Sequence, residues 1–181
     1  SHMTAKNRFP KIFESAKTMQ PSARRVLSFG CSTGEEAQTL AEYFPDAEIV
    51  GVDIDYNSVV AARKNNAHKD RVFYHTDLGA TGKYDVVTCL MVLFSLEKPV
   101  PHDKWLEAIR AIDKHTNIGG VVLLYTSDHP FKSADVSANY EAIREWVRVH
   151  DKNKKEYFCG YYRKVRVKDY VETTEVPPAV G

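Results

Sequence analysis

The sequence predicts one doubly wound α/β domain, with a mostly parallel sheet, helices on both faces and an antiparallel edge strand at the C-terminal end. Three observations lead to this fold class. Apolar runs alternate with amphipathic segments along the chain, and this order is typical of a parallel sheet with crossover helices. The apolar runs are continuous, as in strands buried on both faces. The 181 residues, 43% hydrophobic and 27% charged, suit one folded domain.

Five apolar runs are predicted to be strands, and Gly30, Asp53 and the Gly119-Gly120 pair each mark a strand boundary. These strands cover residues 25–29, 48–52, 72–74, 84–90 and 121–125. Amphipathic spacing predicts helices over residues 10–18, 35–43, 58–66 and 104–115. Ser58 and Asp103 are the expected caps of the last two.

The pattern weakens after Pro130. Residues 140–149 are predicted to form a helix, because Ile143, Trp146 and Val147 recur at helical spacing. One or two edge strands are expected within residues 157–171. Within them, residues 163–168 alternate basic and apolar side chains, which predicts a strand with one basic face. That face is either a solvated, charge-guarded edge or a surface for an acidic acceptor or nucleic acid.

Composition narrows the functional classes. The net charge of +1 disfavours a nonspecific nucleic-acid binder. The three cysteines lack C-x-x-C spacing, so neither a disulfide framework nor a metal site is expected. No apolar run approaches ~18 residues and no signal peptide is visible, so we expect a cytoplasmic protein without a membrane segment. Residues 1–3 resemble a cloning remnant, residues 4–175 form the single domain, and residues 176–181 are expected to be a flexible tail.

The turn after the first strand carries the strongest chemical signal. Gly30 and Gly34 enclose the small residues Cys31-Ser32-Thr33, so backbone can pass close to a ligand. Ligands of open α/β sheets bind beyond the carboxyl ends of the strands. Asp53 ends the second strand, at a spacing from Gly30 that suits a bidentate hold on ribose hydroxyls.

A nicotinamide dinucleotide would also use a ribose-binding acid, but two features disfavour it. The glycine spacing is G-x-x-x-G, and Glu35 and Glu36 occupy the helix start that would otherwise bind a diphosphate. S-adenosylmethionine (SAM) has a ribose, an adenine and two cationic groups, and it has no phosphate. The charge pattern therefore favours SAM, with a purely structural strand-to-helix turn as the alternative.

These segments resemble the class I SAM-dependent methyltransferases. Residues 26–36 resemble the first motif of that family, and the wording G-C-S-T-G-E-E is closest to the chemotaxis-receptor methyltransferases. Residues 51–55, 75–78 and 84–93 are similar to the motifs of the second, third and fourth strands. Leu90 and Met91 stand where the chemotaxis enzymes have Arg and Asn. The resemblance implies a set of cofactor-binding residues: Gly30, Cys31, Ser32, Gly34, Glu35, Asp53, Ile54, Asp77, Leu78, Met91 and Val92.

Methyl transfer is an in-line displacement, and it needs a base only when the acceptor must lose a proton. His129 is the candidate base and Tyr125 the candidate wall of an acceptor pocket around residues 125–131. A surface-loop histidine and a core tyrosine are the alternatives. Cys31 lies near a helix start that could lower the pKa of its thiol. The favoured interpretation is a small side chain that only fills space in the turn.

The sequence therefore predicts a SAM-dependent methyltransferase for an unidentified small-molecule or protein acceptor. The second hypothesis is a SAM-binding module without catalysis, and the third is an NAD-dependent oxidoreductase. The helix at residues 10–18, a partner subunit or a large acceptor would close the site, so a homo-oligomer is left open.

Overall fold

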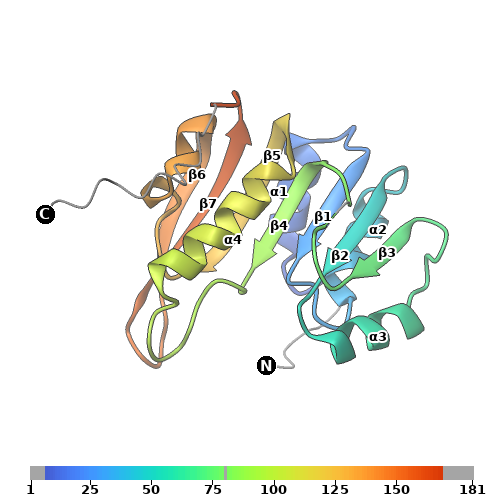
Figure 1. Cartoon of the computed structure of the whole chain (residues 1–181), viewed down its shortest axis with the longest axis horizontal. Coiled ribbons are helices and arrows are strands. Elements are labelled where there is room, and N and C mark those ends of the chain that lie inside the picture. The colour runs from blue at the N-terminus through green and yellow to red at the C-terminus, as the bar shows by residue number, and fades with distance from the viewer. Residues whose placement is uncertain (1–6, 80, 169–181) are drawn as a thin grey trace, which may run out of the picture.

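The computed structural model describes residues 7–79 and 81–168. Their strands form one seven-stranded sheet in the order β3-β2-β1-β4-β5-β7-β6 (Figure 1). The first five strands are parallel, whereas β7 runs antiparallel to both β5 and β6. The strands are β1 (Arg25–Phe29), β2 (Glu48–Val52), β3 (Val72–His75), β4 (Tyr84–Leu90), β5 (Thr116–Ser127), β6 (Tyr140–Val149) and β7 (Glu156–Lys164).

Helices cover both faces of the sheet. In Figure 1, α4 crosses the near face while α1 and α2 lie behind the strands. The helices are α1 (Pro10–Met19), α2 (Glu35–Tyr43), α3 (Tyr56–Lys64) and α4 (His102–Lys114), with the short turns η1 (Phe131–Ser133) and η2 (Asp135–Asn139). No helix of the described residues is long and apolar enough to cross a membrane.

Two apolar cores follow from this layering. One contains Phe13, Leu40 and Val59 from α1, α2 and α3, packed on one face of the sheet. The other contains Trp105 and Ile109 from α4, packed on the opposite face. Strand residues point alternately into the two cores, which confirms the doubly wound arrangement predicted from the continuous apolar strands.

The predicted elements up to residue 125 are present, with shifts at their ends. Strand β5 begins at Thr116, so the Gly119-Gly120 pair lies inside this strand and the boundary predicted there is wrong. Helix α3 begins two residues before Ser58, because the Asp55 carboxylate caps it by accepting from the Asn57 amide and the Ser58 hydroxyl. Helix α4 begins at His102 after Pro101, so Asp103 lies in its first turn and is not its cap. A nearby carboxylate still favours both helix starts, through the helix dipole.

The helix predicted over residues 140–149 is wrong, since these residues form β6, the outermost strand. A bulge between Ala142 and Arg144 adds one residue opposite β7. The extra residue breaks the period-two alternation, and this leaves Ile143 and Trp146 at a spacing that imitates a helix. The antiparallel strand β7 therefore lies inside the sheet, and β6 is the edge.

The basic strand face predicted over residues 163–168 is also wrong. Strand β7 ends at Lys164, whose side chain is buried. The Lys164 ammonium lies 3.1 Å from a carboxylate oxygen of Asp113 and donates to the Asp113 carbonyl at 2.6 Å. Arg163 donates to the Gly119 carbonyl at 2.7 Å. Lys164 therefore joins β7 to the end of α4 in the interior, and the partly buried Arg163 joins β7 to β5.

Replacing Lys164 with Met should lower the free energy of unfolding by about 3 kcal/mol, because the Asp113 carboxylate would stay buried without its cation. Urea denaturation followed by circular dichroism measures this loss. The matched control is Lys104→Met, which removes a pair whose side chains are 70% and 76% exposed and should cost under about 1 kcal/mol. Equal losses in the two variants would contradict a stabilising role for the buried pair.

Candidate functional site

The carboxyl ends of β1, β2 and β4 open into a cleft of about 660 Å³. Strand β1 has β2 on one side and β4 on the other, so the chain direction around the sheet reverses here. Such a switch point is where open α/β sheets bind ligands. Six residues predicted from the sequence to bind the cofactor line this cleft: Gly30, Asp53, Ile54, Asp77, Leu78 and Val92.

The turn between β1 and α2 needs both of its glycines. Gly30 has φ of +78°, and a Cβ there would lie 2.5 Å from Cγ2 of Val92. Gly34 has φ of +97°, and a Cβ there would lie 2.6 Å from the Tyr74 hydroxyl. Both positions combine a left-handed backbone with a close approach, so no other residue fits without strain.

Asp53 joins the end of β2 to this turn. One carboxylate oxygen accepts from the Ser32 amide at 2.8 Å, and the other accepts from the Asp55 amide at 2.9 Å. Ser32 itself has φ of +50°, an uncommon conformation that the hydrogen bond to Asp53 stabilises. Asp53 is half-buried, and each carboxylate oxygen keeps a lone pair for a ligand.

Apolar side chains form the walls on both sides of Asp53. Ile54 is 94% exposed, although it follows directly after a buried strand. Leu78 is buried on one side of the cleft, and Val92 lies against Gly30 on the other. Asp77, beside Leu78, is exposed at the rim. An aromatic base would cover the Ile54 side chain, which is otherwise fully in water.

The two glutamates of the turn have different surroundings. The Glu35 carboxylate accepts from the Thr33 hydroxyl at 2.6 Å and 2.7 Å. Glu36 is buried, and this burial raises the pKa of its carboxyl to about 7, with the nearby Arg8 opposing the change. The Arg8 guanidinium also contacts Sδ of Met91 at 2.9 Å. The Arg8 cation therefore lies near the Glu36 carboxyl and also contacts the residue that follows β4.

Sequence reasoning missed Arg8 and Glu36 as site residues. For Glu36 the sequence contains an indication, since two adjacent glutamates stand at the predicted helix start. Only Glu35 of this pair is among the residues predicted to bind the cofactor. For Arg8 there was none, because 83 residues separate it from Met91 and only the folded chain brings them together.

The three cysteines are buried and unpaired. Burial raises the pKa of the Cys31 thiol, and the carboxylates of Asp53 and Glu36 raise it further. The lowered pKa considered for Cys31 beside a helix start is therefore wrong, since burial and negative charge outweigh the dipole. Cys31 fills space between the turn and β2.

Backbone strain gathers at the same edge of the sheet. Met91 directly follows β4 and has φ of +56°, and Thr126 near the end of β5 has φ of +61°. For a β-branched residue such as Thr126, a left-handed conformation is a genuine outlier. Ser32 adds a third case after β1, so strain occurs at three neighbouring strand ends, as is common at functional sites.

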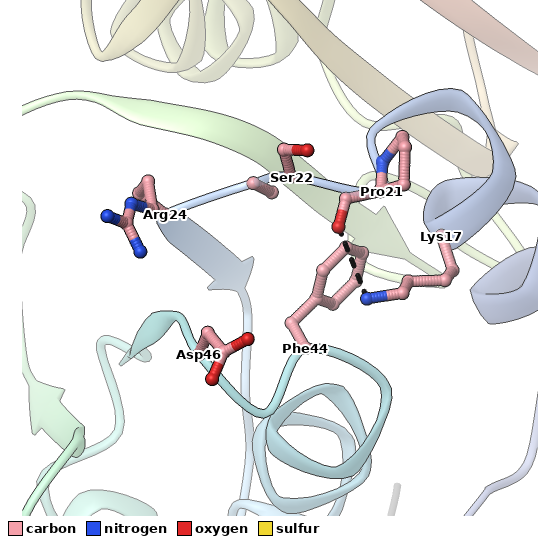
Figure 2. Close-up of a pocket in the computed structure, with 7 residues that line it drawn as sticks. Lys17, Pro21, Ser22, Arg24, Phe44 and Asp46 are labelled. Atoms are coloured by element: carbon pink, nitrogen blue, oxygen red, sulfur yellow. Dashed lines mark hydrogen bonds between the residues drawn. The ribbon is translucent and has the colours of Figure 1, made fainter.

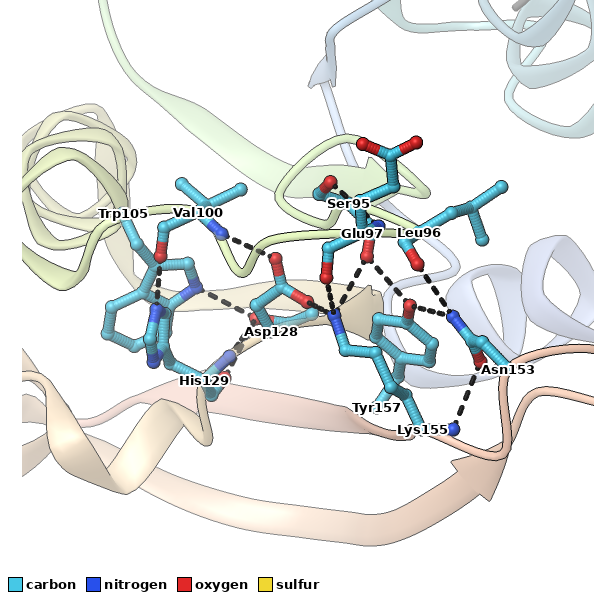
Figure 3. Close-up of polar contacts among 11 residues, drawn as sticks. Ser95, Leu96, Glu97, Val100, Trp105, Asp128, His129, Asn153, Lys155 and Tyr157 are labelled. Carbon is cyan, nitrogen blue, oxygen red and sulfur yellow. Dashed lines mark hydrogen bonds and ion pairs between the residues drawn. The ribbon is translucent and has the colours of Figure 1, made fainter.

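His129 and Tyr125, the predicted catalytic candidates, have separate surroundings. The His129 ring nitrogen Nε2 lies 2.6 Å from the Val100 carbonyl, and the ring packs edge-on against Trp105 (Figure 3). The Tyr125 ring lies 5.3 Å from the Phe9 ring, and its carbonyl accepts from the Met91 amide. The structure thus brings Tyr125, rather than His129, next to a predicted cofactor residue.

A polar network holds the loop that follows β4. Figure 3 shows Lys155 and Tyr157 of the β6–β7 hairpin reaching the Ser95 carbonyl, at 3.1 Å and 2.7 Å. The Asp128 carboxylate accepts from the Val100 amide at 2.7 Å and lies 3.7 Å from the Lys155 ammonium. Because Met91 and Val92 begin this loop, the hairpin helps to position one wall of the cleft.

A second hollow lies at the opposite, amino ends of β1 and β2. Figure 2 shows Lys17 there, with its ammonium donating to the Pro21 carbonyl at 3.3 Å and lying over the Phe44 ring. Its volume is about 240 Å³, and no residue predicted to bind a ligand lines it. Within residues 7–79 and 81–168, no group of three or more His, Cys, Asp or Glu could hold a metal ion.

The buried Glu36 predicts a specific pH dependence of stability. The pKa of Glu36 is about 7 in the folded chain against a usual 4.5. The contribution of this carboxyl to the free energy of unfolding is therefore full below pH 4.5 and is lost as the pH rises through 7. Glu36→Gln should therefore match the wild type at low pH and exceed its unfolding free energy by up to roughly 3 kcal/mol at pH 8. Urea titrations between pH 5 and 8 measure the difference.

The control for this prediction is Glu14→Gln, an exposed acid on α1. Its difference from the wild type should stay constant over the same pH range. A constant difference for Glu36→Gln as well would show that the Glu36 carboxyl titrates as in water.

Comparison with known proteins points to one family. The profile described as "Methyltransferase domain" matches residues 4–165. The malonyl-[acyl-carrier protein] O-methyltransferase of Legionella pneumophila subsp. pneumophila is 26% identical over 156 residues, which are 78% of this chain and 51% of that protein. The chain therefore spans about half the length of this relative.

Solved structures share the fold. The N-methyltransferase NodS from Bradyrhizobium japonicum WM9, in complex with S-adenosylhomocysteine, superposes with a TM-score of 0.64 at 13% identity, over 87% of each chain. The O-methyltransferase TomG from Streptomyces achromogenes, in complex with SAM, gives 0.60 at 17% identity, over 86% of this chain and 78% of that chain. With the profile match over most of its length, the chain belongs to the methyltransferase domain family and has the Rossmann-like fold of class I SAM-dependent methyltransferases.

Proposed function

We propose that this chain is a SAM-dependent methyltransferase whose cofactor lies in the cleft over β1, β2 and β4. One observation carries the proposal: the glycine turn, the acid after β2 and the apolar residues after β3 and β4 line a single cleft. A ribose, an adenine and a cationic amino-acid end would each meet a matching surface there.

The charges along the cleft favour SAM over a dinucleotide. Asp53, Asp77 and Glu107 line it, against the single cation Lys104. Glu35 and Glu36 add two acids at the start of α2, where a diphosphate would otherwise bind. Such an acidic surface repels phosphate and attracts a sulfonium and an ammonium.

Each part of the cofactor has a proposed partner. Asp53 would bind the ribose hydroxyls, while Ile54, Leu78 and Val92 would enclose the adenine. Gly30, Ser32 and Gly34 would pass beneath the methionine part. Arg8, which contacts Met91 and lies near Glu36, would face the carboxylate of that part, and Glu36 would face its ammonium.

The chemotaxis-receptor wording of the first motif covers only residues 30–36, and these residues shape the cofactor site. We therefore use the similarity to the chemotaxis-receptor methyltransferases as support for the cofactor site and draw nothing from it about the acceptor. The Legionella relative carries malonyl-[acyl-carrier protein] in its name. For this chain we propose a small-molecule or protein acceptor that lies beyond Met91, at the ends of β4 and β5.

When bound, SAM supplies a methyl group activated by a positive sulfur. An acceptor atom would take this methyl group in an in-line displacement that leaves the carbon–sulfur bonding pair on sulfur. The role of this chain would be to align the acceptor with the cofactor. Tyr125 lies beside Met91 and is the proposed acceptor wall, whereas the contacts of His129 favour a role in positioning the loop.

Replacing Asp53 with Ala should weaken SAM binding by about 30- to 700-fold, because hydrogen bonds from a charged group to the ribose are lost. Isothermal titration with SAM, S-adenosylhomocysteine and NAD measures this. The Asp53→Ala substitution also removes the hydrogen bond that the Ser32 amide donates to Asp53. Thermal melting of each variant must therefore accompany the titration, to show that the variant is folded.

Asp55→Asn is the matched control, because this acid caps α3 nearby and does not line the cleft. It should leave SAM affinity within about twofold, a difference below 1 kcal/mol. If folded wild type does not bind SAM, or if it binds NAD instead, the cofactor proposal fails.

Turnover separates an enzyme from a SAM-binding module without catalysis. Release of S-adenosylhomocysteine with some member of an acceptor panel would establish the enzyme. The wild type should bind SAM in either case, and the Glu36→Gln variant should bind it more weakly, since one negative charge facing the ammonium is lost. Unchanged affinity in Glu36→Gln would remove this residue from the proposed site.

A further inference from the structure

A band of alternating aromatic rings and guanidinium groups lies beside the cofactor cleft. We call it the aromatic–cationic face, and it is located where β5, β7 and β6 end near the N-terminal segment. The Tyr125 and Trp146 rings lie 6.4 Å apart, and the Trp146 and Tyr161 rings lie 5.2 Å apart. The face is made of Arg8, Phe9, Tyr125, Arg144, Trp146, Arg148 and Tyr161.

Each partly buried ring of this face has a cation above it. Arg8 lies 4.8 Å from the Phe9 ring centre, Arg148 lies 5.2 Å from that of Tyr125, and Arg144 lies 4.4 Å from that of Trp146. Stacking of this kind holds a guanidinium flat on a ring while its N–H groups remain available to a ligand.

Two of these arginines lack a carboxylate partner. Among residues 7–79 and 81–168, neither Arg144 nor Arg148 forms an ion pair. Arg148 donates one hydrogen bond to the Thr126 hydroxyl at 3.0 Å. The neighbouring Glu145 carboxylate accepts from the Tyr162 hydroxyl at 2.8 Å, on the opposite face of the sheet, so it does not neutralise them.

The aromatic–cationic face begins one residue from the cofactor wall. Val92 lines the cleft, and the amide of the preceding Met91 donates to the Tyr125 carbonyl at 2.8 Å. Arg8 contacts Met91 from the other side. The strained backbones of Met91 and Thr126 lie at the ends of β4 and β5, between Val92 of the cleft and Tyr125 of the face.

We infer that the methyl acceptor is an anion with a flat unsaturated part. Its carboxylate or phosphate would bind Arg144 and Arg148, and its flat part would stack on Tyr125 and Trp146. This inference rests on the proposed function, because it places the acceptor beside a bound SAM. Guanidinium groups bind both anions through paired N–H donors, and the rings supply stacking area.

Isothermal titration of 2-naphthoate into the protein saturated with S-adenosylhomocysteine tests the inference. We expect saturable binding with a Kd of about 1 mM or tighter. The neutral 2-naphthamide, of equal shape, should bind at least about tenfold more weakly, as expected for loss of a charged hydrogen bond. 2-Naphthyl phosphate, titrated in parallel, distinguishes a phosphate acceptor from a carboxylate acceptor by its relative affinity.

Variants locate the binding surface. Arg144→Gln and Arg148→Gln should each raise the Kd for 2-naphthoate about tenfold, and Trp146→Ala should raise it similarly. Arg148→Lys keeps the charge and should recover part of the loss. Arg24→Gln, which removes an exposed arginine at the amino ends of the strands, is the matched control and should change nothing.

Three results would overturn the inference: no saturation by 2-naphthoate, equal affinity for the amide, or an unchanged Kd in both arginine variants. Tighter binding of a single-stranded oligouridylate that displaces 2-naphthoate would also overturn it, and would assign the face to nucleic acid. SAM is titrated into the same preparations. SAM binding without 2-naphthoate binding defeats only the acceptor inference. Binding of 2-naphthoate without SAM binding defeats the cofactor proposal, and the acceptor inference falls with it.

Discussion

The hydrogen bond from the Ser32 amide to the Asp53 carboxylate, 2.8 Å long, is the interaction on which the site depends. It fixes the turn after β1 against the end of β2, so the two strands that bound the cleft cannot move independently. It also holds Ser32 in a left-handed conformation, whose cost is offset by the bond to a charged acceptor. The carboxylate that we propose to bind the ribose is therefore the same group that shapes the adjacent turn.

The other parts of the site are arranged around that fixed turn. Gly30 lets Val92 approach, and Gly34 lets the Tyr74 hydroxyl approach, so β4 and β3 close on the turn from two sides. The polar network from Asp128 and the β6–β7 hairpin then holds the loop after β4. Through this loop the antiparallel half of the sheet, which is remote in sequence, supports the cofactor half.

The proposed acceptor surface lies on the face of the sheet opposite α4. The turns η1 and η2 follow β5, and their residues Phe131 and Val136 pack with α4 in one core. Tyr125 and Trp146 pack against the other core. Both rings and Arg148 stay partly exposed there.

Local information determined much of the structure. Continuous apolar runs and glycine boundaries predicted strands β1, β2 and β4 with their observed ends, because a buried parallel strand leaves a direct trace in composition. The turn motif, Asp53 and the resemblance to class I methyltransferases named eleven cofactor residues, and six of them line one cleft. The strand predictions depend on residues close together in the chain, and the shared cleft follows from the general topology of parallel sheets.

Only the tertiary structure determined the features that depend on contacts between residues far apart in the sequence. Strand β6 was predicted as a helix, because a bulge against β7 disguised its alternation. Lys164 was assigned to a solvated face, but Asp113 on α4 draws it into the interior. Arg8 contacts Met91 and lies near Glu36, and no local pattern encodes these approaches. In each case the deciding contact joins segments far apart in sequence, and only the folded sheet brings them within reach.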